Sequence, residues 1–236
     1  MRLFLAFVAL AAATRANALT YNLTHLNANN QEVCGPIQDD EALFLYALVR
    51  GMRMERILEI GGLGGYSARN FLAAMAESYN PKMITVDLQP VPSQAANHVV
   101  ITKDATLLQP SDLDGKPLDL VFFDCHEYDV QMATYERLLS QGLITDATVI
   151  ALHDTHVWPR SALQYCGVGT IHTSEGYIHQ LAERRMVNKF KELGYDVLTL
   201  HTPHSRLLGP GLRMRHGVTV CTRFHSLKNA ATAGAL

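Results

Sequence analysis

Acidic and imidazole side chains follow two apolar stretches of the sequence that we expect to form buried strands. Asp124, with Cys125 and His126 beside it, follows one stretch, and His153 and Asp154 follow the other. Because parallel strands end at the same edge of a sheet, these side chains should converge above one crevice. Two carboxylates with nearby imidazoles could bind a hard divalent cation such as Mg²⁺, or a softer cation if a histidine joins. Alternatively, either histidine could act as general base toward a substrate hydroxyl, or the acids cap loops and the histidines satisfy core polar groups.

A glycine-rich segment, residues 59–67, lies between a short apolar stretch and a helical pattern. Its glycines would let the backbone approach a ligand closely, and the start of the following helix offers free amide groups. Leu63 occupies the place of the middle glycine of the dinucleotide fingerprint G-x-G-x-x-G, which argues against an NAD-type site. Taken alone, such a segment can simply reverse the direction of the chain.

Two further acids stand where predicted strands end. Asp87 ends the next apolar stretch, where a carboxylate could accept hydrogen bonds from both hydroxyls of a ribose. Asp104, followed by Ala105, comes after the third stretch and could accept a hydrogen bond from an adenine amino group. Helix capping explains Asp104 equally well. With the glycine segment, these acids indicate a site for a nucleoside.

Apolar runs of strand length alternate with amphipathic runs of helix length along most of the chain. The predicted strands cover residues 57–60, 83–87, 98–102, 118–123, 148–152, 195–200 and 218–224. The predicted helices cover residues 40–51, 67–77, 130–139 and 178–193. This alternation predicts an α/β fold with a doubly wound, seven-stranded sheet that is mostly parallel and has helices on both faces. No helix separates the last two strands, so we expect an antiparallel edge strand.

A single domain over residues 19–236 is expected, because the sequence contains no interdomain linker and no internal repeat. One irregular stretch, residues 155–177, contains Trp158 and several histidines. A loop of this length inside a compact domain usually has a function, and we expect it to close over a substrate.

Composition and charge narrow the class of protein. The 236 residues are 48% hydrophobic and 18% charged, with a formal net charge of −2, which favours a globular fold over disorder. A nearly neutral chain without a basic run is not expected to bind nucleic acid. The cysteines have the spacing of neither a zinc site nor a disulfide framework. They are Cys34, Cys125, Cys166 and Cys221.

The first 18 residues have the features of a secretory signal peptide. Arg2 precedes an apolar run over residues 3–13, and Ala16-Asn17-Ala18 has the pattern of a cleavage site. The run is too short to span a bilayer, so no stable membrane anchor is expected. The alternative is an alanine-rich helix that packs on the domain. We therefore expect a cytoplasmic or organellar protein, or a secretory-pathway protein if residues 1–18 are a signal peptide.

Two sequence motifs resemble those of a known enzyme class. Residues 57–67, ILEIGGLGGYS, resemble the first motif of class I S-adenosylmethionine (SAM)-dependent methyltransferases, and are most similar to small O-methyltransferases of the catechol and caffeoyl-coenzyme A kind. Residues 119–154 resemble a methyltransferase group with Asp, His and Tyr after the fourth strand and His-Asp after the fifth. The similarity extends over residues 38–224 and implies a Rossmann-like form of the predicted sheet. Thr155 replaces the asparagine of catechol-type enzymes and His153 is unlike their pattern, so metal-dependent and metal-free chemistry both stay open.

The resemblance also implies a cofactor site for SAM. The implied cofactor-binding residues are Glu59, Gly61, Gly65, Tyr66, Ser67, Asp87, Asp104, Ala105 and Asp124. Among them, Glu59 and the two glycines would shape the methionine pocket. Asp87 would hold the ribose, and Asp104 with Ala105 would border the adenine.

The function predicted from these features is SAM-dependent methylation of a hydroxyl group on a small molecule. His126, His153 and Asp154 are the predicted catalytic residues. Asp124 and Asp154 fall where metal-dependent relatives place acidic ligands, so a divalent cation such as Mg²⁺ is the second expected cofactor. The alternative function is a catalytically silent SAM-binding or interaction domain. A small-molecule acceptor is the expected partner, and the oligomeric state stays open, with a homodimer as one option.

Overall fold

The computed structural model describes residue 37 and residues 39–155, 181–200 and 217–223. Its strands are β1 (Arg56–Ile60), β2 (Lys82–Asp87), β3 (His98–Thr102), β4 (Leu120–Phe123), β5 (Val149–Leu152), β6 (Asp196–Leu200) and β7 (Val218–Thr222). Its helices are α2 (Asp39–Met52), α3 (Tyr66–Ala74), α4 (Tyr128–Ser140) and α6 (Leu181–Glu192), with two 3₁₀ helices, η2 (Ala105–Leu107) and η3 (Pro110–Leu113). The predictions for residues 1–18 and for nearly all of residues 155–177, including Trp158, lie outside the described residues. No helix within the described ranges is long and apolar enough to cross a membrane.

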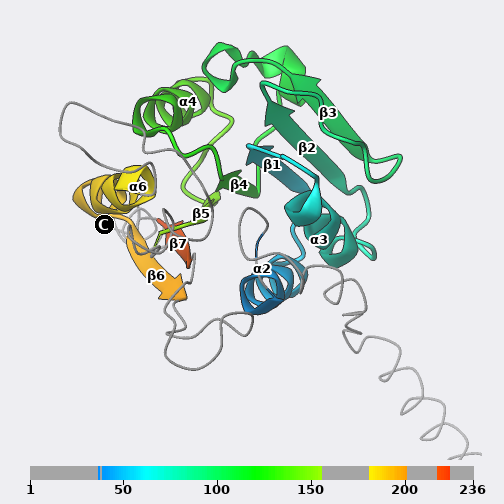
Figure 1. The fold of residues 1–236 in the computed structure, drawn as a ribbon, viewed down its shortest axis with the longest axis horizontal. Helices are drawn as coiled ribbons and strands as arrows, with labels where there is room; N and C mark the ends of the chain where they lie inside the picture. The colour runs from blue at the N-terminus through cyan, green and yellow to red at the C-terminus, as the bar shows by residue number, and fades with distance from the viewer. Residues whose placement is uncertain (1–36, 38, 156–180, 201–216, 224–236) are drawn as a thin grey trace, which may run out of the picture.

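Seven strands form one sheet in the order β3-β2-β1-β4-β5-β7-β6 (Figure 1). Strands β1 to β5 run parallel, whereas β7 lies antiparallel between β5 and β6. The predicted α/β fold is therefore confirmed, with a mostly parallel sheet of seven strands and antiparallel pairing at one edge. The order of the strands reverses between β1 and β4, and ligands of such sheets bind outside the carboxyl ends of the strands at that point.

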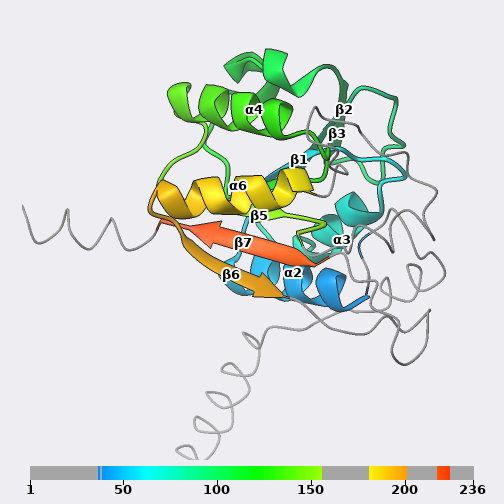
Figure 2. The ribbon, with the colours of Figure 1, turned by 60° about the vertical axis from the view of Figure 1, so that its left-hand side comes forward.

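Helices cover both faces of the sheet, with α2 and α3 on one side and α4 and α6 on the other (Figures 1 and 2). Side chains alternate between the faces along β1: Ile57 packs with the α2 and α3 layer, whereas Leu58 and Ile60 pack with the α4 and α6 layer. Strands β4 and β5 are buried along their whole length, as expected of parallel strands covered on both faces. The carboxyl ends of the strands therefore form the edge at which a ligand can reach the sheet.

The chain between β3 and β4 contains both 3₁₀ helices, which the hydrophobic pattern does not predict. The side chain of Asp104 caps η2 by accepting a hydrogen bond from the amide of Thr106 at 2.8 Å. Pro110 opens η3, where its fixed φ suits the first turn of a helix. Helix capping by Asp104, one of the two explanations considered for this residue, is confirmed.

Candidate active site

One cavity of about 490 Å³ opens at the carboxyl ends of β1, β2 and β4. This volume lies in the range of small-molecule and cofactor sites. The wall contains six of the predicted site residues: Gly61, Asp87, Asp104, Ala105, Asp124 and His126. The structure thus brings the glycine segment, the acids that follow three strands and one imidazole to a single cavity.

The turn between β1 and α3 requires glycine at position 61. Gly61 has a φ of +90°, and a Cβ built on it would lie 2.4 Å from the carbonyl oxygen of Asp124. Its amide donates to the carbonyl of Val86 at 2.9 Å, so the turn is held between the ends of the two strands that flank β1. Leu63, further along the turn, has a φ of +40° and is 72% exposed. The backbone of the turn can therefore approach a ligand in the cavity closely.

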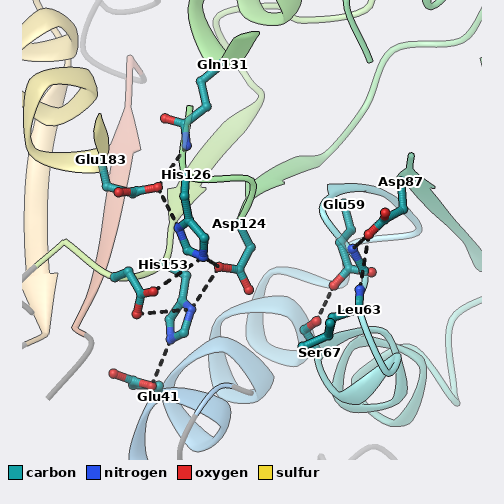
Figure 3. A network of polar contacts seen from close by, with 12 residues as sticks. Glu41, Glu59, Leu63, Ser67, Asp87, Asp124, His126, Gln131, His153 and Glu183 are labelled. Atoms are coloured by element: carbon teal, nitrogen blue, oxygen red, sulfur yellow. Dashed lines mark hydrogen bonds and ion pairs between the residues drawn. The ribbon is translucent and has the colours of Figure 1, made fainter. Parts of the chain in front are cut away.

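Asp87, at the end of β2, holds this turn by its backbone. Its Oδ2 accepts hydrogen bonds from the amides of Gly62 at 2.8 Å and Leu63 at 3.2 Å (Figure 3). Its Oδ1 accepts from the amide of Gln89 at 2.9 Å. A carboxylate offers about four lone-pair sites. Asp87 can therefore accept a further hydrogen bond from a ligand in the cavity that it lines.

Asp104 and Ala105 form the part of the wall that follows β3. Asp104 accepts hydrogen bonds from the hydroxyl and the amide of Thr106, at 2.7 and 2.8 Å, and these bonds lower the pKa of its carboxyl group. Lys103, beside them in the wall, forms an ion pair with Asp112 at 2.7 Å. The charges on this side of the cavity are therefore partnered within the protein.

Four other residues predicted to bind the cofactor lie behind the turn and not in the cavity wall: Glu59, Gly65, Tyr66 and Ser67. Glu59 is fully buried between the sheet and α3, where it accepts hydrogen bonds from the hydroxyls of Ser67 and Thr85. Burial raises the pKa of Glu59 to about 7, although the two hydrogen bonds act in the opposite direction. The guanidinium of Arg69 lies 5.1 Å from the ring centre of Tyr66. These residues support the turn, and cofactor binding stays a prediction for them.

Carboxyl and imidazole groups form a second network beside the cavity, which we call the carboxyl–imidazole cluster. Its members are Glu41, Asp124, His126, His153, Asp154 and Glu183. They come from α2, from α6 and from the segments after β4 and β5, so elements from both faces of the sheet meet here (Figure 3). Asp124 belongs both to the cluster and to the cavity wall.

His153 is enclosed between two carboxyl groups of this cluster. Its Nδ1 lies 3.0 Å from Oδ1 of Asp124, and its Nε2 lies 3.3 Å from Oε2 of Glu41 (Figure 3). Burial opposes the charged form of this ring, but the charges of Asp154 and Asp124 raise the pKa of His153 well above its ordinary value. The side chain of His153 is fully buried and does not line the cavity. It connects α2 to the end of β4.

His126 is the imidazole that faces the cavity. Its Nδ1 lies 2.9 Å from Oε1 of Glu183, and its Nε2 lies 3.5 Å from carboxylate oxygens of both Asp124 and Asp154. Burial opposes protonation, but the hydrogen bond to Glu183 and the charges of the two aspartates raise the pKa of His126 to about 10. The ring is therefore protonated at neutral pH. Gln131 also donates to Oε1 of Glu183, at 3.0 Å.

The backbone at the cluster is strained at two positions. His126 and Asp154 both have a φ of +56°, in the left-handed region that non-glycine residues seldom occupy. Such residues cost on the order of 1 kcal/mol each, persist where surrounding contacts hold them and concentrate at active sites. The ion pair between the two side chains, at 3.5 Å, is one of the contacts that hold them here.

Three residues of the cluster could hold a metal ion. Asp124, His126 and Asp154 each place one donor atom so that the three atoms lie within 4.8 Å of one another. Two carboxylates and one imidazole suit a divalent cation. The hydroxyl of Thr155, next in the sequence to Asp154, accepts a hydrogen bond from Thr219 at 2.9 Å.

Glu41 and Glu183 are site residues that sequence reasoning missed. Both are buried, with 1% and 0% exposure. Glu41 stands four residues before Leu45, and Glu183 stands four residues before Val187, so each lies on the apolar stripe of its helix. An acid on a buried stripe is costly unless it is paired. This pattern is the signal that could have identified them.

Comparison with known families identifies the region that contains the cavity. A family model described as a methyltransferase domain matches residues 58–155. Residues 58–155 are therefore similar to this methyltransferase domain family. The match begins within β1 and ends just after β5, so it contains the glycine turn, Asp87, Asp124 and Asp154. The predicted relationship to class I methyltransferases is confirmed. No curated protein matches the sequence.

Solved methyltransferase structures share the fold of the chain. The methyltransferase PaMTH1 of Podospora anserina, bound to SAH (S-adenosylhomocysteine), is 16% identical, with a TM-score of 0.54 over 92% of this chain and 94% of its own. The O-methyltransferase of Bacillus cereus, also in complex with SAH, is 16% identical, with a TM-score of 0.55 over 91% and 97%. The O-methyltransferase TomG of Streptomyces achromogenes, in complex with SAM, is 15% identical, with a TM-score of 0.54 over 91% and 95%. At these identities the likeness shows a common Rossmann-like fold.

Proposed function

We propose that this protein transfers the methyl group of SAM to a hydroxyl group of a small molecule. The observation that carries the proposal is that one cavity joins Gly61 and Asp87 to Asp124 and His126. The first pair suits a nucleoside and the second pair suits a proton transfer. The methyltransferase domain match and the O-methyltransferases of the same fold that were solved with SAH or SAM support this proposal.

The cavity wall fits SAM in three places. Asp87 has lone pairs to spare beside the backbone of the turn, where it would accept hydrogen bonds from the ribose hydroxyls. Asp104 and Ala105 would border the adenine. Gly61 contributes bare backbone to the cavity wall, and the methionine part would lie against it. Bound SAM supplies a methyl group on a sulfonium, and the remaining chemistry belongs to the residues of the chain.

Asp124 is the group best placed to receive the proton of the acceptor hydroxyl. It lines the cavity, whereas His153 is buried and acts as a positioning residue that holds Oδ1 of Asp124 at 3.0 Å. His126 is protonated at neutral pH, so it donates hydrogen bonds and does not accept the proton. As the acceptor oxygen gains the methyl group, its proton passes to the carboxylate of Asp124. Holding the acceptor in line beside this carboxylate is what the protein must contribute.

A divalent cation would fit the same donors. Asp124, His126 and Asp154 group their donor atoms, two carboxylates and one imidazole. A bound cation would lower the pKa of the acceptor hydroxyl. Coordination by His126 requires the unprotonated ring. The metal-dependent and metal-free forms of the enzyme therefore differ in the charge on this imidazole.

Methyl transfer is tested by incubating the full-length protein with methyl-labelled SAM and a panel of acceptors. The panel contains catechols, sugars, macrolides and peptides with free hydroxyl groups, each with and without EDTA. We expect a labelled methyl ether with at least one small acceptor, and activity that EDTA removes and Mg²⁺ restores if the cation is required. Binding of SAH without transfer to any acceptor would instead support a silent SAM-binding domain. Absence of both binding and transfer would contradict the proposal.

The segment of residues 1–18 keeps two interpretations, a cleaved signal peptide or a helix packed on the domain. Mass spectrometry of the mature N-terminus distinguishes them. A chain that begins near residue 19 indicates the secretory pathway, and a chain that retains the segment indicates the cytoplasm or an organelle without cleavage at this site.

A further inference from the structure

Two side chains pack against the glycine turn of the cavity: Thr85 in β2 and Gln94 in the segment between β2 and β3. A Cβ at Gly62 would lie 2.3 Å from Cγ2 of Thr85, and a Cβ at Gly65 would lie 2.6 Å from Nε2 of Gln94. The methyl group of Thr85 and the side chain of Gln94 therefore pack directly against the turn at its two ends. Any shift of these two supports would move the turn.

His98, the first residue of β3, forms a hydrogen bond with each of these supports. Its Nε2 lies 2.8 Å from Oγ1 of Thr85, and its Nδ1 accepts from the backbone amide of Gln94 at 3.0 Å. His98 is 5% exposed, and burial lowers the pKa of its ring, which favours the neutral form. Because Nδ1 is an acceptor, the proton of the neutral ring is on Nε2 and is donated to Thr85.

The hydrogen bond from His98 continues to the first turn of α3. Thr85 accepts from the imidazole, so its own hydroxyl proton is donated to Oε2 of Glu59 at 2.7 Å. The other carboxyl oxygen of Glu59 accepts from the hydroxyl of Ser67 in α3 (Figure 3). All four side chains are buried. The network therefore ties the strand beneath the turn to the helix that follows the turn.

We propose that His98 is a positioning residue for cofactor binding, because its two ring nitrogens hold both supports of the glycine turn. Its role is to set the amides of Gly62 and Leu63 against the carboxylate of Asp87, to which they donate. His98 itself does not line the cavity. This inference rests on the proposed SAM site, since the turn is taken to hold the cofactor.

Two substitutions at His98 separate its two hydrogen bonds. His98→Asn keeps an acceptor near the position of Nδ1, and His98→Gln keeps a donor near the position of Nε2. A third variant, Thr85→Val, keeps the methyl group beneath Gly62 and removes only the hydroxyl. Thr148→Val is the matched control, because it removes a buried hydroxyl that donates to the carbonyl of Leu118 at 2.8 Å at the opposite end of the sheet.

Amide hydrogen exchange and SAH binding are measured on the same full-length proteins. Exchange at Gly62 and Leu63 reports on the turn without any cofactor, and calorimetry with SAH reports on the site. We expect the two His98 variants and Thr85→Val to exchange faster at these amides and to bind SAH about tenfold more weakly, which corresponds to about 1.4 kcal/mol. We expect Thr148→Val to change neither quantity.

The two measurements separate this inference from the proposed function. Folded variants with unchanged exchange and unchanged SAH affinity would overturn the role of His98, whatever the wild type binds. Faster exchange in the variants of a protein whose wild type binds no SAH would overturn the proposed function and leave the support of the turn by His98 in place. Thr85→Val keeps the test decisive if the His98 variants fail to fold.

Discussion

The two sides of the candidate cavity use histidine in opposite ways. Behind the glycine turn, His98 is neutral and lies in a chain of hydrogen bonds whose direction is fixed by the amide of Gln94. At the ends of β4 and β5, His126 and His153 are protonated and lie among carboxyl groups. The neutral His98 holds the glycine turn in one conformation, whereas the protonated His126 and His153 offset the negative charge of neighbouring carboxyl groups.

This difference matches the two tasks that the cavity is proposed to perform. A turn that holds a nucleoside must keep backbone amides in place, and a neutral His98 supports that turn without adding a further charge to that of Asp87. A group that receives a proton must be held beside the acceptor, and Nδ1 of His153, 3.0 Å from Oδ1 of Asp124, keeps this carboxylate in place. Substitutions behind the glycine turn should therefore weaken cofactor binding, whereas substitutions at Asp124 should lower turnover.

The largest effect is expected from Asp124→Asn. The amide cannot accept the hydroxyl proton, and both histidines of the cluster lose a charged partner. We expect turnover to fall by about 100-fold or more, in the range of losses seen when a general base is removed. Radiolabel transfer measures turnover, and calorimetry should show SAH affinity within about tenfold of the wild type, or about 1.4 kcal/mol.

The control for this variant is Asp146→Asn, which neutralises a partly exposed acid ahead of β5, paired with Arg223 at 3.7 Å. Its turnover should match that of the wild type. Equal turnover of Asp124→Asn and Asp146→Asn would remove Asp124 from the chemistry.

The next largest effect is expected from Gly61→Ala, which tests how tightly the glycine turn packs at the cavity. The new methyl group would meet the carbonyl of Asp124 at 2.4 Å in a backbone with φ of +90°. We expect the free energy of unfolding to fall by about 2 kcal/mol or more, since backbone strain and overpacking add. Gly51→Ala is the matched control: no atom of the described residues lies within 4 Å of its new methyl group in α2, and the substitution should raise stability by up to about 1 kcal/mol. Urea unfolding measures the stability of both variants. Equal stabilities of Gly61→Ala and Gly51→Ala would contradict the close packing of Gly61 against the carbonyl of Asp124.

The pH dependence of stability should have opposite signs on the two sides. The pKa of His126 is raised from 6.5 to about 10, so its stabilising contribution is complete below pH 6.5 and is lost as the pH rises toward 10. The pKa of His98 is lowered, so its contribution is complete above 6.5 and is lost as the pH falls through the lowered value. The stability difference between wild type and His126→Gln should therefore shrink from pH 6 to pH 10. The corresponding difference for His98→Asn should shrink as the pH falls from 7 to 5. Urea unfolding at each pH measures the two stability differences. If both differences shrank in the same direction of pH, the proposed contrast between His126 and His98 would be refuted.

The smallest effect is expected at Asp104, where the wall of the cavity is also a helix cap. Asp104→Ala removes the acceptor for the amide of Thr106 and should lower the free energy of unfolding by about 1 kcal/mol. Asp104→Asn retains a good capping group and should stay near wild-type stability. Thermal unfolding compares the three proteins. If Asp104→Asn were as unstable as Asp104→Ala, the charge and not the cap would explain the residue.

Much of the fold follows from the sequence because the central strands are buried on both faces. Runs such as residues 57–60 and 148–152 are apolar at nearly every position, which is typical of parallel strands under two helix layers. The 3₁₀ helices at residues 105–107 and 110–113 were missed because polar caps and a proline, not hydrophobic periodicity, form them.

The candidate site could be predicted only where residue type and strand end coincide. Asp87 and Asp124 follow their strands directly, so the common edge of the parallel strands brings them together. Glu59 lies on a strand too, but the alternation of side chains turns it toward α3 and away from the cavity. The contacts of His98 and of Glu183 depend on which strand or helix lies beside them, and a single sequence does not give that information.

The central claim is that a nucleoside-binding turn and a proton-accepting carboxylate share one cavity. The most direct test is a crystal structure of the full-length protein in complex with SAH. We predict that the ribose hydroxyls lie within hydrogen-bond distance of Asp87 and that the sulfur faces the side of the cavity formed by Asp124 and His126. SAH bound elsewhere on the protein, or bound with its sulfur directed away from Asp124, would contradict the account.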